Sequence, residues 1–110
     1  MGFTYWDKVR GSTSITNVGT NAGVTVASSA AAAGKYYSPV SFDASGDAAA
    51  LLTIESPAGT VIWRKRFAGA FTTSGAFDPG MVKGADGQLI QIKISASTSN
   101  CEANLQAVLL

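Results

Sequence analysis

Few side chains of this 110-residue chain are of types that carry out catalysis. It has no histidine, one cysteine, and seven acidic against eight basic residues. A nucleophile needs a base that a third group orients, and without histidine that base would have to be a lysine or a carboxylate. No such group stands at a recognisable spacing, so the sequence predicts neither an enzyme nor a cofactor site.

The same shortage limits metal binding. One cysteine without histidine cannot build a tetrahedral zinc site, so only oxygen ligands for calcium remain. Asp43 and Asp47, in the segment FDASGD, are the place to look for such a site. A polar hairpin loop whose aspartates hydrogen-bond to backbone amides explains this segment better, and we predict no metal site. Cys101 falls on the apolar side of a predicted strand, so we expect it to be buried and inert.

The densest local feature is the basic run Arg64-Lys65-Arg66, which lies between Trp63 and Phe67. Aromatic and basic side chains together can bind single-stranded nucleic acid. In a strand, however, Arg64 and Arg66 share one face and Lys65 lies on the other. Three positive charges in a chain of net charge +1 make a weak polyanion binder. We therefore expect Arg64 and Arg66 to belong to a solvated strand face or a protein interface, and no nucleic-acid partner.

Five aromatic residues are candidates for contacts with other proteins or with the chain's own core. Phe3, Tyr5 and Trp6 precede the first plausible strand. They either fold back over an open edge of the core or reach a neighbouring subunit, since aromatic side chains are enriched in the centres of interfaces. Tyr36 and Tyr37 are adjacent, so one of them must face outward in a strand. We count Phe3, Tyr5, Trp6 and Tyr37 with Arg64 and Arg66 as candidate interface residues.

The elements that must position these side chains are β-strands. Ile90, Ile92 and Ile94 alternate with polar residues, as expected of a half-buried strand. Ser56-Pro57-Ala58-Gly59 predicts a hairpin turn, and the polar residues 96–100 predict a second one. Residues 28–34 are rich in alanine but too few to hold a helix, so we expect a loop there. The predicted strands are Ser12 to Val18, Val24 to Ser28, Tyr36 to Phe42, Ala49 to Ser56, Thr60 to Phe67, Leu89 to Ser95 and Cys101 to Leu109, with one more short strand within 68–87.

Seven or eight strands at a spacing of about 8 to 12 residues predict a single all-β domain, an antiparallel β-sandwich or barrel. We expect residues 1–11 to form an N-terminal arm and residues 12–110 to form the sandwich. Charged residues are only 14% of the chain, against about 25% in typical domains, so small polar residues must cover a surface open to contact. No apolar run of 18 residues and no signal peptide is present, which predicts synthesis in the cytoplasm and no membrane partner.

Three segments resemble small structural proteins encoded among the head and tail genes of tailed bacteriophages. They are GSTSITNVGTNAGVTV, GKYYSPVSFDASGDAAALLTIESPAGTVIWRKRF and GADGQLIQIKISASTSNCEANLQAVLL. The most specific part is LLTIES, a tight turn, and TVIW. The pattern is similar to that of the decoration or cement proteins, which have a β-sandwich or jelly-roll fold and sit on assembled capsids, commonly as trimers.

This resemblance implies a jelly-roll-like virion structural protein. Its partners would be the major capsid protein and further copies of itself in a homotrimer, and its location would be the capsid surface. No family contact residue can be transferred to a position of this chain, so the candidate interface residues rest on the physical arguments above. The alternative is a phage tail module that binds a receptor or a carbohydrate, in which exposed Trp and Tyr side chains would stack on sugar rings.

Overall fold

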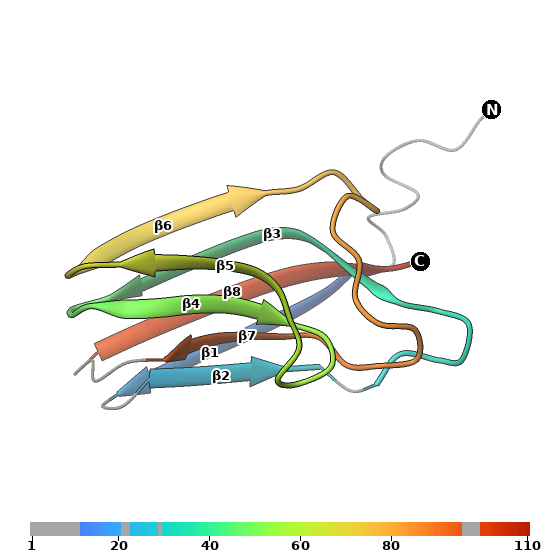
Figure 1. Cartoon of the computed structure of the whole chain (residues 1–110), viewed down its shortest axis with the longest axis horizontal. Helices are drawn as coiled ribbons and strands as arrows, with labels where there is room; N and C mark the ends of the chain where they lie inside the picture. Colours follow the sequence, from blue (N-terminus) through green and yellow to red (C-terminus); the bar gives the residue numbers. More distant parts are fainter. Residues whose placement is uncertain (1–11, 21–22, 29, 96–99) are drawn as a thin grey trace.

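The structure is a computed structural model that describes residues 12–20, 23–28, 30–95 and 100–110; within these, the side chains of residues 12–26 and 100 are left out of the description. The described ranges contain eight strands, and no helix long and apolar enough to cross a membrane occurs in them (Figure 1). The strands are β1 (Ser12–Thr20), β2 (Gly23–Ala27), β3 (Tyr37–Gly46), β4 (Ala50–Glu55), β5 (Val61–Phe67), β6 (Phe71–Ala76), β7 (Gln91–Ser95) and β8 (Asn100–Leu109). The predicted arm, residues 1–11, lies outside the described residues.

The strands form two antiparallel sheets. Sheet A has the order β1-β8-β3-β6, and sheet B has the order β2-β7-β4-β5. The pairing is nested, because β1 pairs with β8, β2 with β7, β3 with β6 and β4 with β5. The prediction of an all-β antiparallel fold is confirmed.

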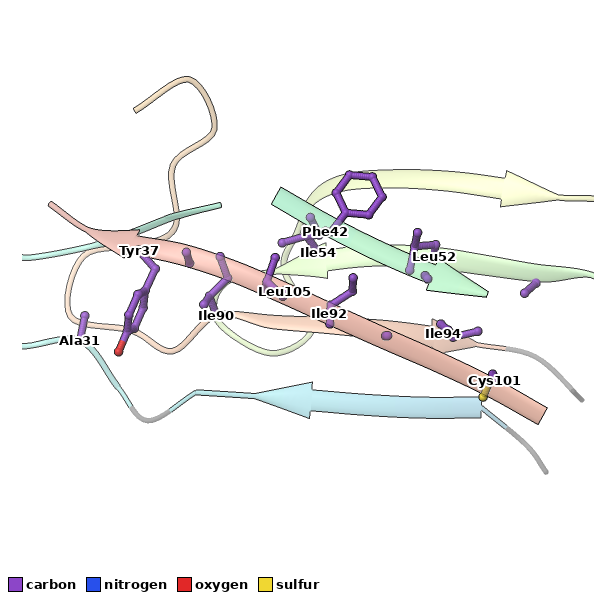
Figure 2. Packing of buried hydrophobic residues seen from close by; sticks show 14 residues of the cluster. Ala31, Tyr37, Phe42, Leu52, Ile54, Ile90, Ile92, Ile94, Cys101 and Leu105 are labelled. Atoms are coloured by element: carbon purple, nitrogen blue, oxygen red, sulfur yellow. The ribbon is translucent and has the colours of Figure 1, made fainter. Parts of the chain in front are cut away.

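The core lies between the two sheets, and the buried side chains that the structure describes in it come mainly from β3, β4, β7 and β8. Ile92 and Ile94 of β7 and Leu105 of β8 are buried, as period-two alternation requires. Figure 2 shows Ile92 and Ile94 of β7, Ile90 just before this strand, and Leu105 of β8 in the same cluster. Cys101 is also buried in this layer, as predicted. Each fully buried Leu or Ile side chain contributes about 1.5–3 kcal/mol through the hydrophobic effect.

Of the two hairpin turns predicted from the sequence, one is correct and the other is wrong. Residues 56–59 do close the hairpin of β4 and β5, with Gly59 at φ 90° and the amide of Ser56 bonded to the carbonyl of Thr60 at 2.9 Å. Residues 96–100 were expected to close a hairpin as well, but β7 and β8 belong to different sheets. A short polar segment is in general long enough both to close a hairpin and to span the roughly 10 Å between packed sheets.

Strand β3 is longer than its sequence indicates. It continues through Asp43 to Gly46, where the sequence predicts a polar hairpin loop. The reason is tertiary, because β3 pairs with β8 on one side and with β6 on the other along this stretch. Ladders on both sides outweigh the low strand propensity of Asp and Gly. The predicted loop at residues 28–34 is confirmed for the described residues 28 and 30–34, which form neither helix nor strand.

Two buried serines hold the long connection 77–90 against one end of the sandwich. Ser38 donates a hydrogen bond to the carbonyl of Val82 at 2.7 Å and accepts one from a backbone amide of the same connection. Ser56 accepts one from the amide of Ala85 at 3.1 Å and donates one to a further carbonyl of the connection. These bonds tie the connection to β3 and to the end of β4.

Candidate protein-binding edge

β5 and β6 are the last strands of their sheets on the same side of the sandwich (Figure 1). This side carries a row of half-buried aromatic rings. We call Trp63, Phe67, Phe71 and Phe77 the edge seam. The rings of Phe67 on β5 and Phe71 on β6 are stacked, with centroids 4.1 Å apart and planes 8° apart. Aromatic pairs of this kind add about 0.5–1.5 kcal/mol to area burial. The seam therefore joins the last strand of sheet B to the last strand of sheet A.

A second aromatic group lies at the other end of the seam. Trp63 is 4.7 Å from the buried ring of Phe42 and 6.0 Å from the ring of Phe77, measured between centroids. The Trp63–Phe77 contact is edge-to-face, an arrangement that the ring quadrupoles favour. Trp63 thus points inward, on the face of β5 that packs against the core.

Gly75 on β6 makes room for this group. It is the cross-strand partner of Phe42, whose ring covers it. A Cβ atom built at Gly75 would lie 2.5 Å from Cε1 and 2.7 Å from Cζ of Phe42. A side chain at this position would require the ring of Phe42 to shift, so the glycine allows the ring to pack directly on the backbone of β6.

The basic run on β5 divides between two faces, as the alternation predicts. Arg64 and Arg66 are exposed on the outer face of sheet B, opposite Thr53 and Leu51 of β4. Neither arginine contacts a carboxylate of the described residues. Lys65 is turned toward the seam, where its Nζ lies 5.5 Å from the centroid of the Phe67 ring. A cation over an aromatic face at this distance is mildly stabilising.

Glu55, at the end of β4, is the one residue of the described chain for which a pKa shift stands out. Its carboxylate is buried and accepts hydrogen bonds from the Gly59 amide at 2.8 Å, the Thr53 hydroxyl at 2.9 Å and the Gln91 side chain at 2.7 Å. Burial acts to raise the pKa of Glu55, but these bonds and the positive charge of Lys93 outweigh it, so the pKa lies below its ordinary value. This carboxylate anchors the β4–β5 turn and is not available for catalysis.

The outer face of sheet A carries a shallow depression of about 640 Å³. Two hydrogen-bonded pairs line it, from Asn104 to Asp43 and from Ser41 to Gln106. The ring of Phe42 beneath it is buried, so the depression offers hydroxyl, amide and carboxylate groups without an exposed aromatic face. Among the described residues, no three His, Cys, Asp or Glu side chains come together in a group that could hold a metal ion.

The structure places the six candidate interface residues as follows. Phe3, Tyr5 and Trp6 lie outside the described residues. Arg64 and Arg66 are exposed, as stated above.

The choice of Tyr37 is wrong, because its side chain is only 5% exposed and belongs to the core. The physical reason is an irregularity in the pairing of β3 with β8 between Pro39 and Ser41. This β-bulge shifts the alternation, so that an odd-numbered Tyr37 and an even-numbered Phe42 both face inward. The less buried ring of the pair is Tyr36, which has the Nζ of Lys83 5.8 Å from its centroid.

Sequence reasoning missed Phe71 and Phe77 as parts of the edge. They fall within 68–87, where the sequence predicts one more short strand without placing it, although FTTSGAF begins and ends with a phenylalanine at an odd-numbered position. That spacing puts both rings on one face of a strand.

Comparisons with protein-family models, with curated proteins and with solved structures find no match. Function must therefore be inferred from the strand order and the surface of the chain itself.

Proposed function

We propose that this protein is a jelly-roll structural protein that decorates an assembled phage capsid as a homotrimer and stabilises the shell through protein contacts. The observation that carries the proposal is the nested strand order, with β1 on β8, β2 on β7, β3 on β6 and β4 on β5. This order arises when one long hairpin is rolled into two facing sheets, the arrangement of jelly rolls, which recur in viral capsid proteins. Fold alone does not assign function, so the surface has to supply the rest.

The surface supports assembly rather than chemistry. Among the residues whose side chains the structure describes, three large apolar ones are exposed: Val61 by 46%, Met81 by 66% and Leu109 by 37%. Val61 begins β5, Leu109 ends β8 and Met81 belongs to the connection 77–90, so all three lie toward the same end of the sandwich. We propose that this end faces the major capsid protein at the outer surface of the virion.

Affinity in such a contact comes from apolar burial at roughly 25 cal/mol per Å², reduced by the costs of association. Exposed ion pairs add only about 0–1 kcal/mol each. Contacts from several copies to several capsid subunits must break together, which raises the effective affinity without any new interaction. Binding is therefore expected to depend little on salt.

A carbohydrate-binding tail module is the second candidate, and the depression on sheet A is the observation that favours it. Asp43, Asn104 and Gln106 present groups that hydrogen-bond to sugar hydroxyls. The half-buried rings lie at the β5–β6 edge and not in the depression, however, so no ring of the described residues is placed to stack on a sugar there. Titration with oligosaccharides tests this candidate: binding that Asn104→Ala abolishes would replace the capsid proposal.

The experiment for the capsid proposal adds purified protein to shells assembled without it and measures occupancy and resistance to heat over a salt series. Saturable binding that persists at about 1 M salt, where the screening length is about 3 Å, is expected. Met81→Asp should reduce occupancy, because it places a charge in the proposed contact. Ala70→Asp adds the same charge to an exposed residue at the opposite end and should bind normally. Absence of binding, or binding lost as salt rises, would contradict the proposal.

A further inference from the structure

Sheet A ends on both sides in strands that carry no charge. β1 reads STSITNVGT and β6 reads FTTSGA, and within the described residues neither has a strand on its outer side. Exposed edges invite pairing with another chain, and proteins usually block them with charged residues, especially lysine, or with proline. Sheet B is blocked in this way at β5 by the consecutive exposed residues Arg64, Lys65 and Arg66, with Lys65 on the core-facing side of the strand over the ring of Phe67.

The directions of the two free edges match. Each strand of sheet A is antiparallel to its neighbours, so β6 runs opposite to β1 across the four strands. If a second copy is placed beside the first by rotation about an axis parallel to the strands, its β1 meets the first copy's β6 in antiparallel orientation. The alternation of strand directions then continues without a break from one copy to the next.

The backbone of β6 offers hydrogen-bond donors to such a neighbour. The amide of Phe77, next to the end of β6, donates to the carbonyl of Val40 at 2.9 Å, so it points toward β3. Amides alternate in direction along a strand, and the pairing of β6 with β3 is regular from Phe71 to Ala76. The amides of Thr72, Ser74 and Ala76 therefore point away from β3, toward the free edge.

We propose that β6 of one copy pairs with β1 of a second copy, and that three such contacts close a ring in which sheet A is continuous. This inference rests on the homotrimer of the proposed function and names the surface that builds it. A head-to-tail contact of this kind joins two different patches and closes when the rotation per subunit divides the circle.

Charge distinguishes this arrangement from a two-fold dimer. A dimer through β6 and β6 would bring two copies of β5 to the same side of the contact, with three basic residues each. Like charges facing each other are unfavourable. In the ring, β5 lies beside β2 of the next copy, whose sequence GVTVA is uncharged. The charge distribution therefore favours a contact in which the β1–β2 side of the second copy faces the β5–β6 side of the first.

The test replaces Ser74 in the full-length chain by proline and measures the mass of the assembly by sedimentation. Proline at this position removes only a donor that points away from β3, and edge strands tolerate proline there. The wild type should sediment with three chain masses at micromolar concentration, and Ser74→Pro should be a folded monomer whose association is weaker on the order of 100-fold. Ser74→Ala removes the same hydroxyl, keeps the amide and should remain a trimer.

A wild type that is monomeric or dimeric, or a Ser74→Pro variant that remains a trimer, would overturn the proposal. A monomer whose melting temperature falls with Ser74→Pro would show that the chain's own residues cover β6, and would overturn it too. Shell occupancy is measured separately. If the wild type is a monomer that binds shells, the capsid function is supported and the ring is contradicted. If it is a trimer that does not bind shells, the ring is supported and the capsid function is contradicted.

Discussion

β5 and β6 are the last strands of their sheets on the same side of the sandwich (Figure 1). They differ in whether charged side chains flank the exposed backbone edge. β5 carries three consecutive basic residues, one of them turned inward over the ring of Phe67. β6 has no charge and has a bare glycine where it passes under Phe42. Charge at an edge protects against pairing, and its absence permits pairing. The difference indicates that only sheet A is built to be extended.

The largest expected effect, on self-association, comes from adding a charge to the edge strand β6; the matching change removes one from β5. Thr73→Lys places an inward charge on β6, as Lys65 does on β5, and should weaken self-association on the order of 100-fold. Lys65→Thr removes a charge from β5 and should leave the trimer intact, because β5 already lies beside the uncharged β2 of the next copy in the ring. Thr72→Lys serves as the control, because Thr72 faces outward and is exposed. Equal sedimentation of all three variants would show that edge charge does not govern association.

Stability should fall by about 3 kcal/mol in Gly75→Ala, near the upper end of the range for overpacking a core. The added Cβ would lie 2.5 Å from Cε1 of Phe42, a ring that is itself buried and packed against Trp63 and Phe77. Gly69→Ala is the matched control, since nothing lies within 4 Å of a Cβ there. Urea denaturation measures both variants. A Gly75→Ala protein as stable as Gly69→Ala would mean that the Phe42 ring can move away from β6.

Glu55→Gln should cost about 1.5–2 kcal/mol at neutral pH, because hydrogen bonds to an ionised group are stronger than those to a neutral one. The pKa of Glu55 is lowered from 4.5 in the folded chain, so its stabilising contribution is present above pH 4.5 and is lost as the pH falls through the folded value. The difference between the two proteins should therefore shrink below pH 4.5. A difference that stays constant down to pH 2 would contradict an ionised Glu55 in the folded state.

The smallest effect is expected from Arg64→Ser and Arg66→Ser. Both arginines are exposed and lack a carboxylate partner in the described chain, and surface changes of this kind usually stay within about 0.5 kcal/mol. Thermal unfolding of each variant should match the wild type. A loss above 1 kcal/mol would place these side chains in a contact that the isolated fold does not show.

Alternation in the sequence was enough to predict the strands that build the core and the hairpin at residues 56–59. It did not reveal which connections cross between sheets, because loops of similar length and composition make hairpins and crossings alike. Tyr37 was misplaced because a β-bulge reverses the alternation within β3, and a bulge depends on the neighbouring strand β8 rather than on local residue types. Phe71 and Phe77 gain their role only when β6 is brought beside β5.

Hydrogen exchange of the backbone amides of β5 and β6 tests the contrast between the two edges most directly. Amides that point out of a free edge exchange rapidly, and those bonded to another strand are protected. In the assembled wild type, the amides of Thr72, Ser74 and Ala76 should be protected and should lose that protection in the Thr73→Lys monomer, while the amides of β5 that point away from β4 exchange rapidly in both. Rapid exchange on β6 in the assembled protein, or protection of both edges alike, would contradict the account.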